Sequence, residues 1–298
     1  MEGVMMKNLD RYAVAVRKPD HEIEVMTDEY KSLGSRYVLG LPIIRGVVNF
    51  GESLYIGLKT LSYSSSFYEE EDYEPGKVEQ FFTKIFGDKL ESVLMGITMV
   101  ISVILALGIF MVLPFFLMKG FLPSYSIRTL IEGIIRVALF LIYIWLISKM
   151  EDIKRVFMYH GAEHKTINCL EHGENLTPEN IKKYSRLHKR CGTSFLLIVM
   201  IVSIVVFMFI RVDSLVWKFV LRILLVPVVA GISYEFIRLA GRSDSKIVNT
   251  LSKPGLYLQY FTTREPDEEM MEVAIKAVEG VFDWREYLRA MHNGELED

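Results

Sequence analysis

Long uncharged runs of apolar residues dominate the pattern of this chain. Ser92–Met118 is a run of 27 residues and Gly192–Ile210 a run of 19, and about 20 apolar residues are enough to cross the hydrocarbon core of a bilayer. Two further apolar segments, Ile127–Ser148 and Leu215–Leu239, contain ionisable residues, which are costly in lipid. The pattern predicts four transmembrane helices.

The ionisable residues inside these segments need partners. We expect Glu132, Arg136 and Arg222 to face the interior of the helix bundle and to pair, although Arg136 could equally extend its charge to the membrane surface. Pro227 predicts a bend near the middle of the fourth span. Beyond it, Glu235 returns toward the side of the membrane where the third span begins, and is a candidate auxiliary carboxylate.

The polar segments have weaker patterns. Tyr12–Val16 and Glu22–Met26 are β-prone on either side of a turn, which predicts a small hairpin. Pro42–Leu61 has helical spacing of its apolar residues and predicts a helix at the membrane surface. The acidic stretch Tyr68–Pro75 is typical of a solvated linker, and Val78–Leu90 resembles an amphipathic lead-in to the first span.

After the fourth span, Pro254–Pro266 looks irregular, whereas Asp267–Ala277 predicts a helix with acidic residues in its first turn. The prediction is therefore a mainly α, polytopic membrane protein with a small N-terminal β-hairpin and cytosolic helical segments. Its six parts are a hairpin element (1–36), an interfacial helix with linker and lead-in (37–91), two spans (92–148), a His-rich loop (149–191), two spans (192–240) and a C-terminal segment (241–298).

The distribution of Lys and Arg predicts the orientation. The connection Lys149–Thr193 carries nine of them, whereas Lys119–Arg128 and Arg211–Lys218 carry two each. Cytoplasmic loops are enriched in these residues, so the His-rich loop and both termini are expected in the cytoplasm of a multi-pass plasma-membrane protein. Met1–Tyr12 lacks the apolar core of a signal peptide.

Composition agrees with this placement. The chain has 298 residues, of which 51% are hydrophobic, a high value for a soluble domain. The cysteines, Cys169 and Cys191, both fall in the cytosolic loop, where thiols stay reduced. The net charge of −3 and the lack of a basic stripe give no indication of a nucleic-acid partner. The bilayer is the expected partner, and homo-oligomer formation is left open.

The segment His160–His164 carries the most specific chemical signal. It reads His-Gly-Ala-Glu-His, the inverse zinc-hydrolase motif H-x-x-E-H. On a helix, His160 and His164 lie on one face and can bind one ion, while Glu163 approaches a water molecule as general base. Met150, Ile153 and Phe157 continue the stripe toward the second span, which predicts that this span extends into the loop as one helix. The alternative to metal binding is a structural role, in which the histidines only hydrogen-bond to carbonyls or cap a helix.

A zinc enzyme usually has three protein ligands and an open position. Four of the six histidines lie within 29 residues in this loop, and Glu171, His172 or His188 could supply the third ligand of a divalent metal, which the imidazoles predict to be zinc. Cys191 could be a soft ligand or a small apolar filler. Lys189 and Arg190 are typical of a basic anchor at anionic headgroups.

Several motifs together are recognisable, namely Glu2–Met6, Ala13–Asp20, His160–Thr166, His188–Phe195, Gly231–Glu235 and Thr262–Asp267. They resemble the YqhQ-like family of bacterial membrane proteins, which carry a domain of unknown function, and the resemblance covers nearly the whole chain. It implies an integral membrane protein of a family described as predicted metal-dependent enzymes.

Two functions from different classes follow. The first is a membrane-embedded, metal-dependent hydrolase with its site at the cytoplasmic surface, for which the clustered histidines argue. The second is a non-enzymatic scaffold or small-solute transport element with a structural His-rich loop, for which the ionisable residues inside the spans argue. A peptide, a lipid headgroup or a phosphoester would each suit a water-activating metal.

Overall fold

The fold is described from a computed structural model. It describes residues 2–8, 10–30, 33, 40–68, 90–118, 124–212, 214–243 and 245–295. The chain divides into two compact units, one formed by Met1–Tyr68 with Leu141–Asp298 and the other by Glu69–Phe140. The predicted acidic linker after Tyr68 and the lead-in Val78–Leu90 lie outside the described residues, apart from their end residues.

The N-terminal sheet has three antiparallel strands in the order β1 (Gly3–Asn8), β2 (Arg11–Arg17) and β3 (Ile23–Glu29). The predicted hairpin is confirmed as β2 and β3, but the prediction missed β1. Val4 and Met6 of β1 point into the core, whereas the residues beside them are more exposed. Such a short alternation was too weak a signal to identify from the sequence.

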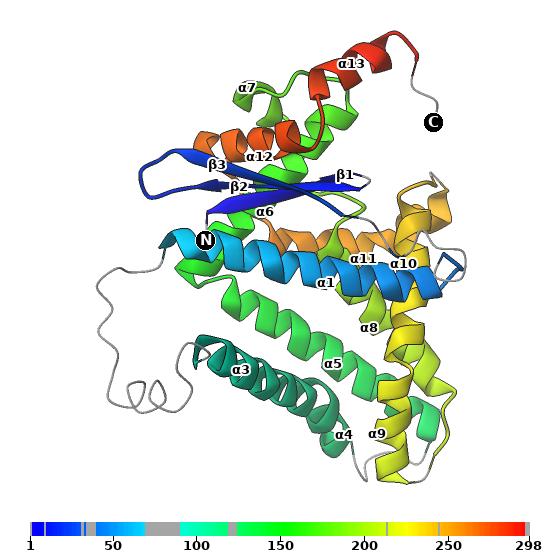
Figure 1. The fold of residues 1–298 in the computed structure, drawn as a ribbon. Helices are drawn as coiled ribbons and strands as arrows, with labels where there is room; N and C mark the ends of the chain where they lie inside the picture. Colours follow the sequence, from blue (N-terminus) through cyan, green and yellow to red (C-terminus); the bar gives the residue numbers. More distant parts are fainter. Residues whose placement is uncertain are drawn as a thin grey trace. The chain divides into compact units, whose positions relative to one another are not determined.

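The central strand β2 is buried on both faces. Ala13 and Ala15 face the core beside helix α12 (Glu268–Val281), while Val14 and Val16 lie with Ile56 in the core beside helix α1 (Ile44–Ser65). Figure 1 shows the sheet between these two helices. Small residues on the α12 side allow a close approach, because a Cβ added at Gly280 of α12 would lie 2.7 Å from the Cβ of Ala13.

Helix α1 (Ile44–Ser65) matches the predicted helix and is followed by a short 3₁₀ turn, η2 (Ser66–Tyr68). Gly46 lies against α10 (Val226–Ala240), where a Cβ on Gly46 would be 2.8 Å from the Cβ of Tyr234. Gly46 therefore serves close helix packing, whereas a Cβ added at Gly51 or Gly57 would meet nothing within 4 Å. Its exposed side chains include Leu54, Tyr55, Leu58 and Leu61, a pattern that fits the predicted position at a membrane surface, which stays a prediction.

The predicted continuous helix through the second span is wrong. Helix α5 (Tyr125–Ile147) ends before a turn, and α6 (Glu151–Glu171) begins after it. Met150 has an extended backbone at the N-cap of α6, and two acidic residues follow in the first turn, where the helix dipole favours them. The stripe of Ile153, Phe157, His160 and His164 therefore belongs to a separate helix.

The C-terminal part is more helical than predicted. The segment read as irregular contains most of α11 (Lys246–Thr262), with Pro254 inside it. Tertiary packing overrides the proline signal, because Gly255 approaches α8 (Gly192–Met208) so closely that its Cβ would lie 2.8 Å from that of Ser194. The predicted helix after Asp267 is confirmed as α12, and Asp267 caps it by accepting a hydrogen bond from Met270 N.

The remaining helices complete the fold of the two units. They are α3 (Leu90–Leu107), the π-helical turn η4 (Gly108–Val112), α4 (Leu113–Leu117), α7 (Pro178–Ile181), α9 (Leu215–Leu224) and α13 (Trp284–His292). The predicted bend of the fourth span is confirmed by the break between α9 and α10, with Pro227 at the start of α10.

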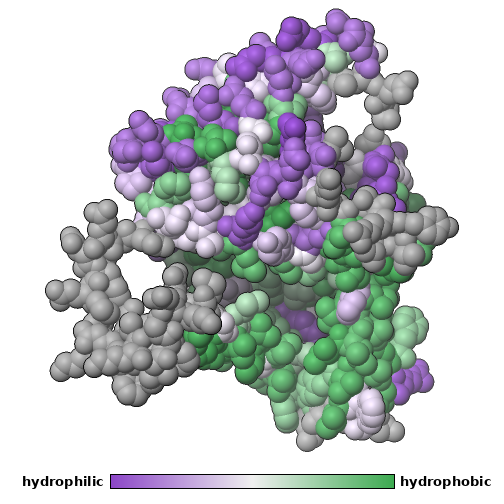
Figure 2. Space-filling view, in the orientation of Figure 1, coloured by the Kyte–Doolittle hydropathy of each residue, from purple (hydrophilic) through white to green (hydrophobic). Residues whose placement is uncertain are grey.

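Three helical stretches among the described residues are long and apolar enough to cross a membrane: Gly96–Leu117, Tyr125–Ile147 and Val216–Ala240. They match three of the four predicted spans. The apolar helix α8 is shorter, with 17 residues, and stays a prediction as the fourth span. Figure 2 shows hydrophobic side chains over α9 and α10 and hydrophilic ones over α12 and α13, as expected for a protein with one part in lipid.

The ionisable residues in the spans are largely buried, as predicted. Glu132 is 1% exposed and its carboxylate lies 4.0 Å from Arg128 Nε, while Arg136 Nε donates a hydrogen bond to Phe110 O. In the other unit, Arg222 is 2% exposed. Burial of such charged groups is compatible with a membrane only when they have partners.

Candidate metal centre

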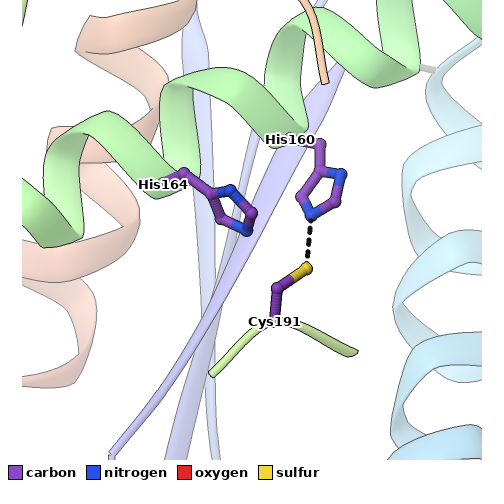
Figure 3. Close-up of side chains that lie close together, drawn as sticks. All are labelled: His160, His164 and Cys191. Atoms are coloured by element: carbon purple, nitrogen blue, oxygen red, sulfur yellow. Dashed lines mark hydrogen bonds between the residues drawn. The ribbon is translucent and has the colours of Figure 1, made fainter. Parts of the chain in front are cut away.

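Helix α6 places the two motif histidines on one face. His160 and His164 are four residues apart, and their ring centroids lie 4.3 Å from each other. Both rings point toward the segment that precedes α8 (Figure 3). His164 is 2% exposed, so the pair faces protein rather than bulk water, as the stripe on the helix predicted.

Backbone carbonyls fix the orientation of both rings. Nδ1 of His160 lies 2.8 Å from Thr262 O, and Nδ1 of His164 lies 2.6 Å from Arg186 O. A carbonyl only accepts hydrogen bonds, so each Nδ1 is the donor and each Nε2 is left for other partners, which for His160 is Sγ of Cys191. Histidines that bind a metal through one ring nitrogen usually donate a hydrogen bond from the other in this way.

A glycine in the motif makes the first of these contacts possible. The chain that follows α11 runs directly across α6, and Arg264 N donates to Phe157 O. A Cβ added at Gly161 would lie 2.0 Å from Arg264 O, so a larger residue at this position would push the crossing chain away. The second residue of the motif is therefore a structural requirement for placing the Thr262 carbonyl.

Cys191 supplies the third atom of the cluster. Its Sγ lies 3.2 Å from His160 Nε2, and one ligand atom from each of His160, His164 and Cys191 falls within 4.8 Å of the others. Cys191 is the N-cap residue of α8 and accepts a hydrogen bond from Thr193 N. These three residues could hold a metal ion.

Two amide side chains hold the loop that carries Cys191. Gln259 of α11 is fully buried; its Oε1 accepts from His188 N, and its Nε2 donates to His188 O and to Ser194 Oγ. Asn168 of α6 donates to the carbonyls of Ser185 and Leu187. The loop is thus tied to both neighbouring helices by hydrogen bonds to its backbone.

Glu163 lies beside the cluster in a cavity of about 550 Å³ that His160, His164 and Cys191 also line. Its side chain makes no hydrogen bond among the described residues. Burial raises the pKa of the Glu163 carboxyl above its usual value, although the charges of His160 and His188 act in the opposite direction. The carboxylate is therefore placed to accept a proton from a molecule in the cavity.

Glu171 and His188 line the same cavity but make a separate pair. His188 Nε2 lies 3.3 Å from the Glu171 carboxylate, which also pairs with Arg190. Burial raises the pKa of Glu171, but the hydrogen bond from His188 and the charge of Arg190 outweigh it and hold that pKa below its usual value. The ring of His188 is 5.8 Å from that of His164, so both residues stay candidates for contact with a ligand.

Two other predicted site residues lie elsewhere. His172 is exposed; its Nδ1 bonds to Asn168 O within α6, and its ring lies 4.9 Å from that of Tyr184. Glu235 pairs with Arg45 of α1, with a closest approach of 2.6 Å. The structure therefore does not bring either side chain to the cluster of His160, His164 and Cys191.

Sequence reasoning ranked Cys191 below the acidic and imidazole candidates and did not identify the roles of Thr262, Arg186 and Gln259. Backbone carbonyls have no sequence signature, so the first two could not be found. Cys191 stands directly before an apolar helix, which is a usable signal because a side chain at that position can cap the helix N-terminus.

Comparison with known proteins places the chain in a family. The model of the family "Protein of unknown function (DUF1385)" matches residues 41–284. The chain belongs to this family. It is also 36% identical over 282 residues to the "Uncharacterized protein YqhQ" of Bacillus subtilis (strain 168), covering 93% of this chain and 88% of that protein. No solved structure matches the chain. The resemblance seen in the sequence is confirmed, while the description of the family as metal-dependent enzymes gains no support from these names.

Proposed function

We propose that this membrane protein is a metal-dependent hydrolase with a zinc ion at His160, His164 and Cys191. The observation that carries the proposal is the convergence of two imidazole Nε2 atoms and a thiol within 4.8 Å, with both Nδ1 atoms bonded to carbonyls. Two His and one Cys are a ligand set of catalytic zinc sites, which keep a fourth position open. The cavity of about 550 Å³ beside the cluster provides room for that position.

The chain's own residues supply the rest of the chemistry. A zinc ion held by these residues would supply a Lewis acid, which would make water easier to deprotonate. Glu163 accepts the proton from the attacking water and returns it to the leaving group, which are the roles of a general base and a general acid. His188 and Arg190 line the cavity and can donate hydrogen bonds to an anionic group of the substrate.

The orientation of the site relative to the membrane follows from the distribution of Lys and Arg residues along the chain. The connection between the second and third predicted spans carries nine Lys and Arg residues, and cytoplasmic loops are enriched in them. The hydrolase therefore acts at the cytoplasmic face of the plasma membrane. Reporter fusions test this, because a tag after Glu171 that is accessible from outside the cell would contradict it.

Metal analysis of the detergent-purified protein tests the site. We expect stoichiometric zinc in the wild type and its loss in a protein carrying both His160→Ala and His164→Ala. His292→Ala removes an imidazole outside the cluster and should keep the metal. If the wild type contains no metal and cannot be loaded with any, the hydrolase proposal fails.

Glu163→Gln separates binding from turnover. The amide keeps the size of the side chain but cannot accept a proton, so we expect full metal content and a loss of about 10²- to 10⁴-fold in hydrolysis. The assay uses peptide, lipid and phosphoester substrates. Glu151→Gln, in the exposed first turn of the same helix, is the matched control. Unchanged hydrolysis by Glu163→Gln would remove the general-base role.

A second function is a non-enzymatic scaffold or a transport element. The buried Glu132 and Arg222 inside predicted spans argue for it, because ionisable residues at membrane depth commonly mark solute or proton pathways. Under this function the His-rich loop is only structural. Wild-type protein without metal, together with transport that depends on Glu132 or Arg222, would favour it over hydrolysis.

A further inference from the structure

A second cavity lies on the other side of the segment that carries Cys191. It has a volume of about 500 Å³ and is lined mainly by apolar side chains of α1, α8 and α10, among them Phe50, Leu54, Phe195, Leu196 and Ile237. Ligand sites are typically apolar cavities of about 300–1,000 Å³ with a few polar groups. The metal-site cavity and this apolar cavity each fall within that range.

The two cavities share one wall. Arg190, Cys191, Gly192 and Thr193 line both of them. Gly192 has no side chain, and a Cβ added there would meet nothing within 4 Å. Gly192 is also exposed, so the two cavities adjoin at a surface residue without a side chain, and one elongated molecule can pass over it to occupy both around the N-terminus of α8.

The shared wall stands at a polar-to-apolar boundary. It begins with Arg190 directly after His188 and Lys189, whereas the 17 residues of α8, which start at Gly192, contain no charge. The apolar cavity is bordered by α10, which belongs to a stretch that can cross a membrane. It is also bordered by α1, whose Leu58 and Leu61 are exposed. The apolar cavity is thus built from the elements that we expect at the bilayer interface.

We propose that the ligand of this double cavity is an anionic membrane phospholipid, with an acyl chain in the apolar cavity and the phosphate at Arg190. This inference rests on the proposed function, since it names the substrate class of the hydrolase. Arg190 lines both cavities. A guanidinium has five N–H donors and binds phosphate oxygens in pairs, while the described pairing with Glu171 uses one donor. The ester bonds of the lipid then lie toward the cluster of His160, His164 and Cys191.

A soluble phosphoester or peptide fits the double cavity less well. Either would leave the apolar cavity filled with water beside Phe50, Phe195 and Leu196, whereas each methylene of a chain placed there gains from leaving water. A zwitterionic lipid would fill the apolar cavity but would bring a cation toward Arg190 and Lys7, which lines the metal-site cavity. Glu163 and Glu171 line this cavity as well, and Glu171 pairs with His188 and Arg190. The preference for an anionic headgroup therefore rests on the phosphate contact assigned to Arg190, and the comparison of an anionic with a zwitterionic lipid tests it.

Photo-crosslinking in nanodiscs tests the proposal. The probe is a phosphatidylglycerol with a photoreactive acyl chain, diluted into phosphatidylcholine nanodiscs that contain the full chain with its metal. We expect crosslinks to peptides containing Phe50 and Leu196. Phosphatidylcholine with the same photoreactive chain should label these peptides at least about tenfold less. Equal labelling by both lipids would overturn the anionic specificity.

Two variants that fill the space provide the decisive comparison. Gly192→Leu puts a side chain into the open space and should reduce crosslinking at least about tenfold, while Gly192→Ala should reduce it less. Gly96→Leu, at another glycine with open space around it, is the matched control and should leave crosslinking unchanged. Ser53→Trp fills the apolar cavity from α1, where Ser53 is exposed, so it serves if Gly192→Leu does not fold. Undiminished crosslinking in both cavity-filling variants would overturn the proposal.

Further measurements on the same samples distinguish the remaining outcomes. Arg190→Gln should remove the preference for phosphatidylglycerol while the chain still crosslinks, and an unchanged preference would exclude Arg190 as the phosphate ligand. Competition by glycerol 3-phosphate as effective as that by the lipid would show a site for soluble phosphates and overturn the lipid proposal. Metal content is measured in parallel: bound zinc without lipid crosslinking refutes only this inference, whereas wild type without zinc refutes the proposed hydrolase.

Discussion

Two turns of helix α6 look alike in sequence and differ in the structure. Each carries imidazole and carboxylate, one at His160–His164 and the other at Glu171–His172. The motif turn, His160–His164, lies against the end of α11 and the loop before α8, and its rings converge with Cys191. The last turn is exposed, and His172 bonds to a carbonyl of its own helix.

The difference shows that clustering of histidines along a chain does not by itself make a metal centre. What distinguishes the motif turn is the set of groups that face it. Thr262 O and Arg186 O accept hydrogen bonds from the two Nδ1 atoms, which leaves both Nε2 atoms for other partners, and Sγ of Cys191 lies 3.2 Å from Nε2 of His160. His172 also has its Nδ1 on a carbonyl, but no further ligand atoms group with it among the described residues.

The largest effect on zinc affinity is expected from Cys191→Ala, and the other cysteine, Cys169, provides the comparison. Cys191→Ala removes a ligand, so zinc affinity should fall more than the roughly 10- to 100-fold lost when a group that hydrogen-bonds to a metal ligand is removed. Cys169 is fully buried in the sheet-side core, and burial raises the pKa of its thiol to about 11, which disfavours metal binding. Cys169→Ala should keep zinc affinity and cost about 1 kcal/mol of stability.

Competition with a chelator measures the affinity of both cysteine variants, and thermal melting measures their stability. Equal zinc affinity in Cys191→Ala and the wild type would contradict the three-atom site. It would return the choice of third ligand to Glu171 or His188, the remaining candidates that line the cavity.

A smaller effect is expected from Gln259→Leu, which tests whether the loop that faces the motif turn must be held rigidly. The change leaves the backbone N–H and C=O of His188 without their partner, and an unsatisfied buried group costs about 1–3 kcal/mol. We expect a lower melting temperature and an approximately tenfold weaker zinc affinity. Thr250→Val, at an exposed position of the same helix, should change neither. Wild-type zinc affinity in Gln259→Leu would show that the loop does not need this tie.

Local patterns predicted much of the fold. Strands β2 and β3, helices α1 and α12, and three of the four spans were identified because each has its own periodicity or an uncharged run of sufficient length. Helix α11 was missed because Pro254 is a local helix breaker, whereas the helix is maintained by contacts with α8. The break before α6 was missed because apolar spacing continues through a turn whose backbone, at Met150, is extended.

The candidate site divides in the same way. His160, Glu163 and His164 could be recognised because their spacing belongs to one helix. Cys191 joins them across 27 residues of chain from His164 and was ranked only as an auxiliary group. Its placement depends on the tertiary ties of Gln259 and on the end of α11, and such ties between distant segments have no periodic signal in one sequence.

The smallest effect is expected at the last turn of α6. His172→Ala removes an exposed imidazole whose hydrogen bond is local, and exposed substitutions of this kind usually change stability by less than about 0.5 kcal/mol. Zinc content and affinity should match the wild type. His188→Ala is the informative neighbour, because His188 lines the cavity and bonds to Glu171, so it should weaken substrate binding while keeping the metal. Loss of zinc in His172→Ala, measured on detergent-purified protein, would mean that the exposed turn folds onto the cluster, and the contrast between the two turns would then be wrong.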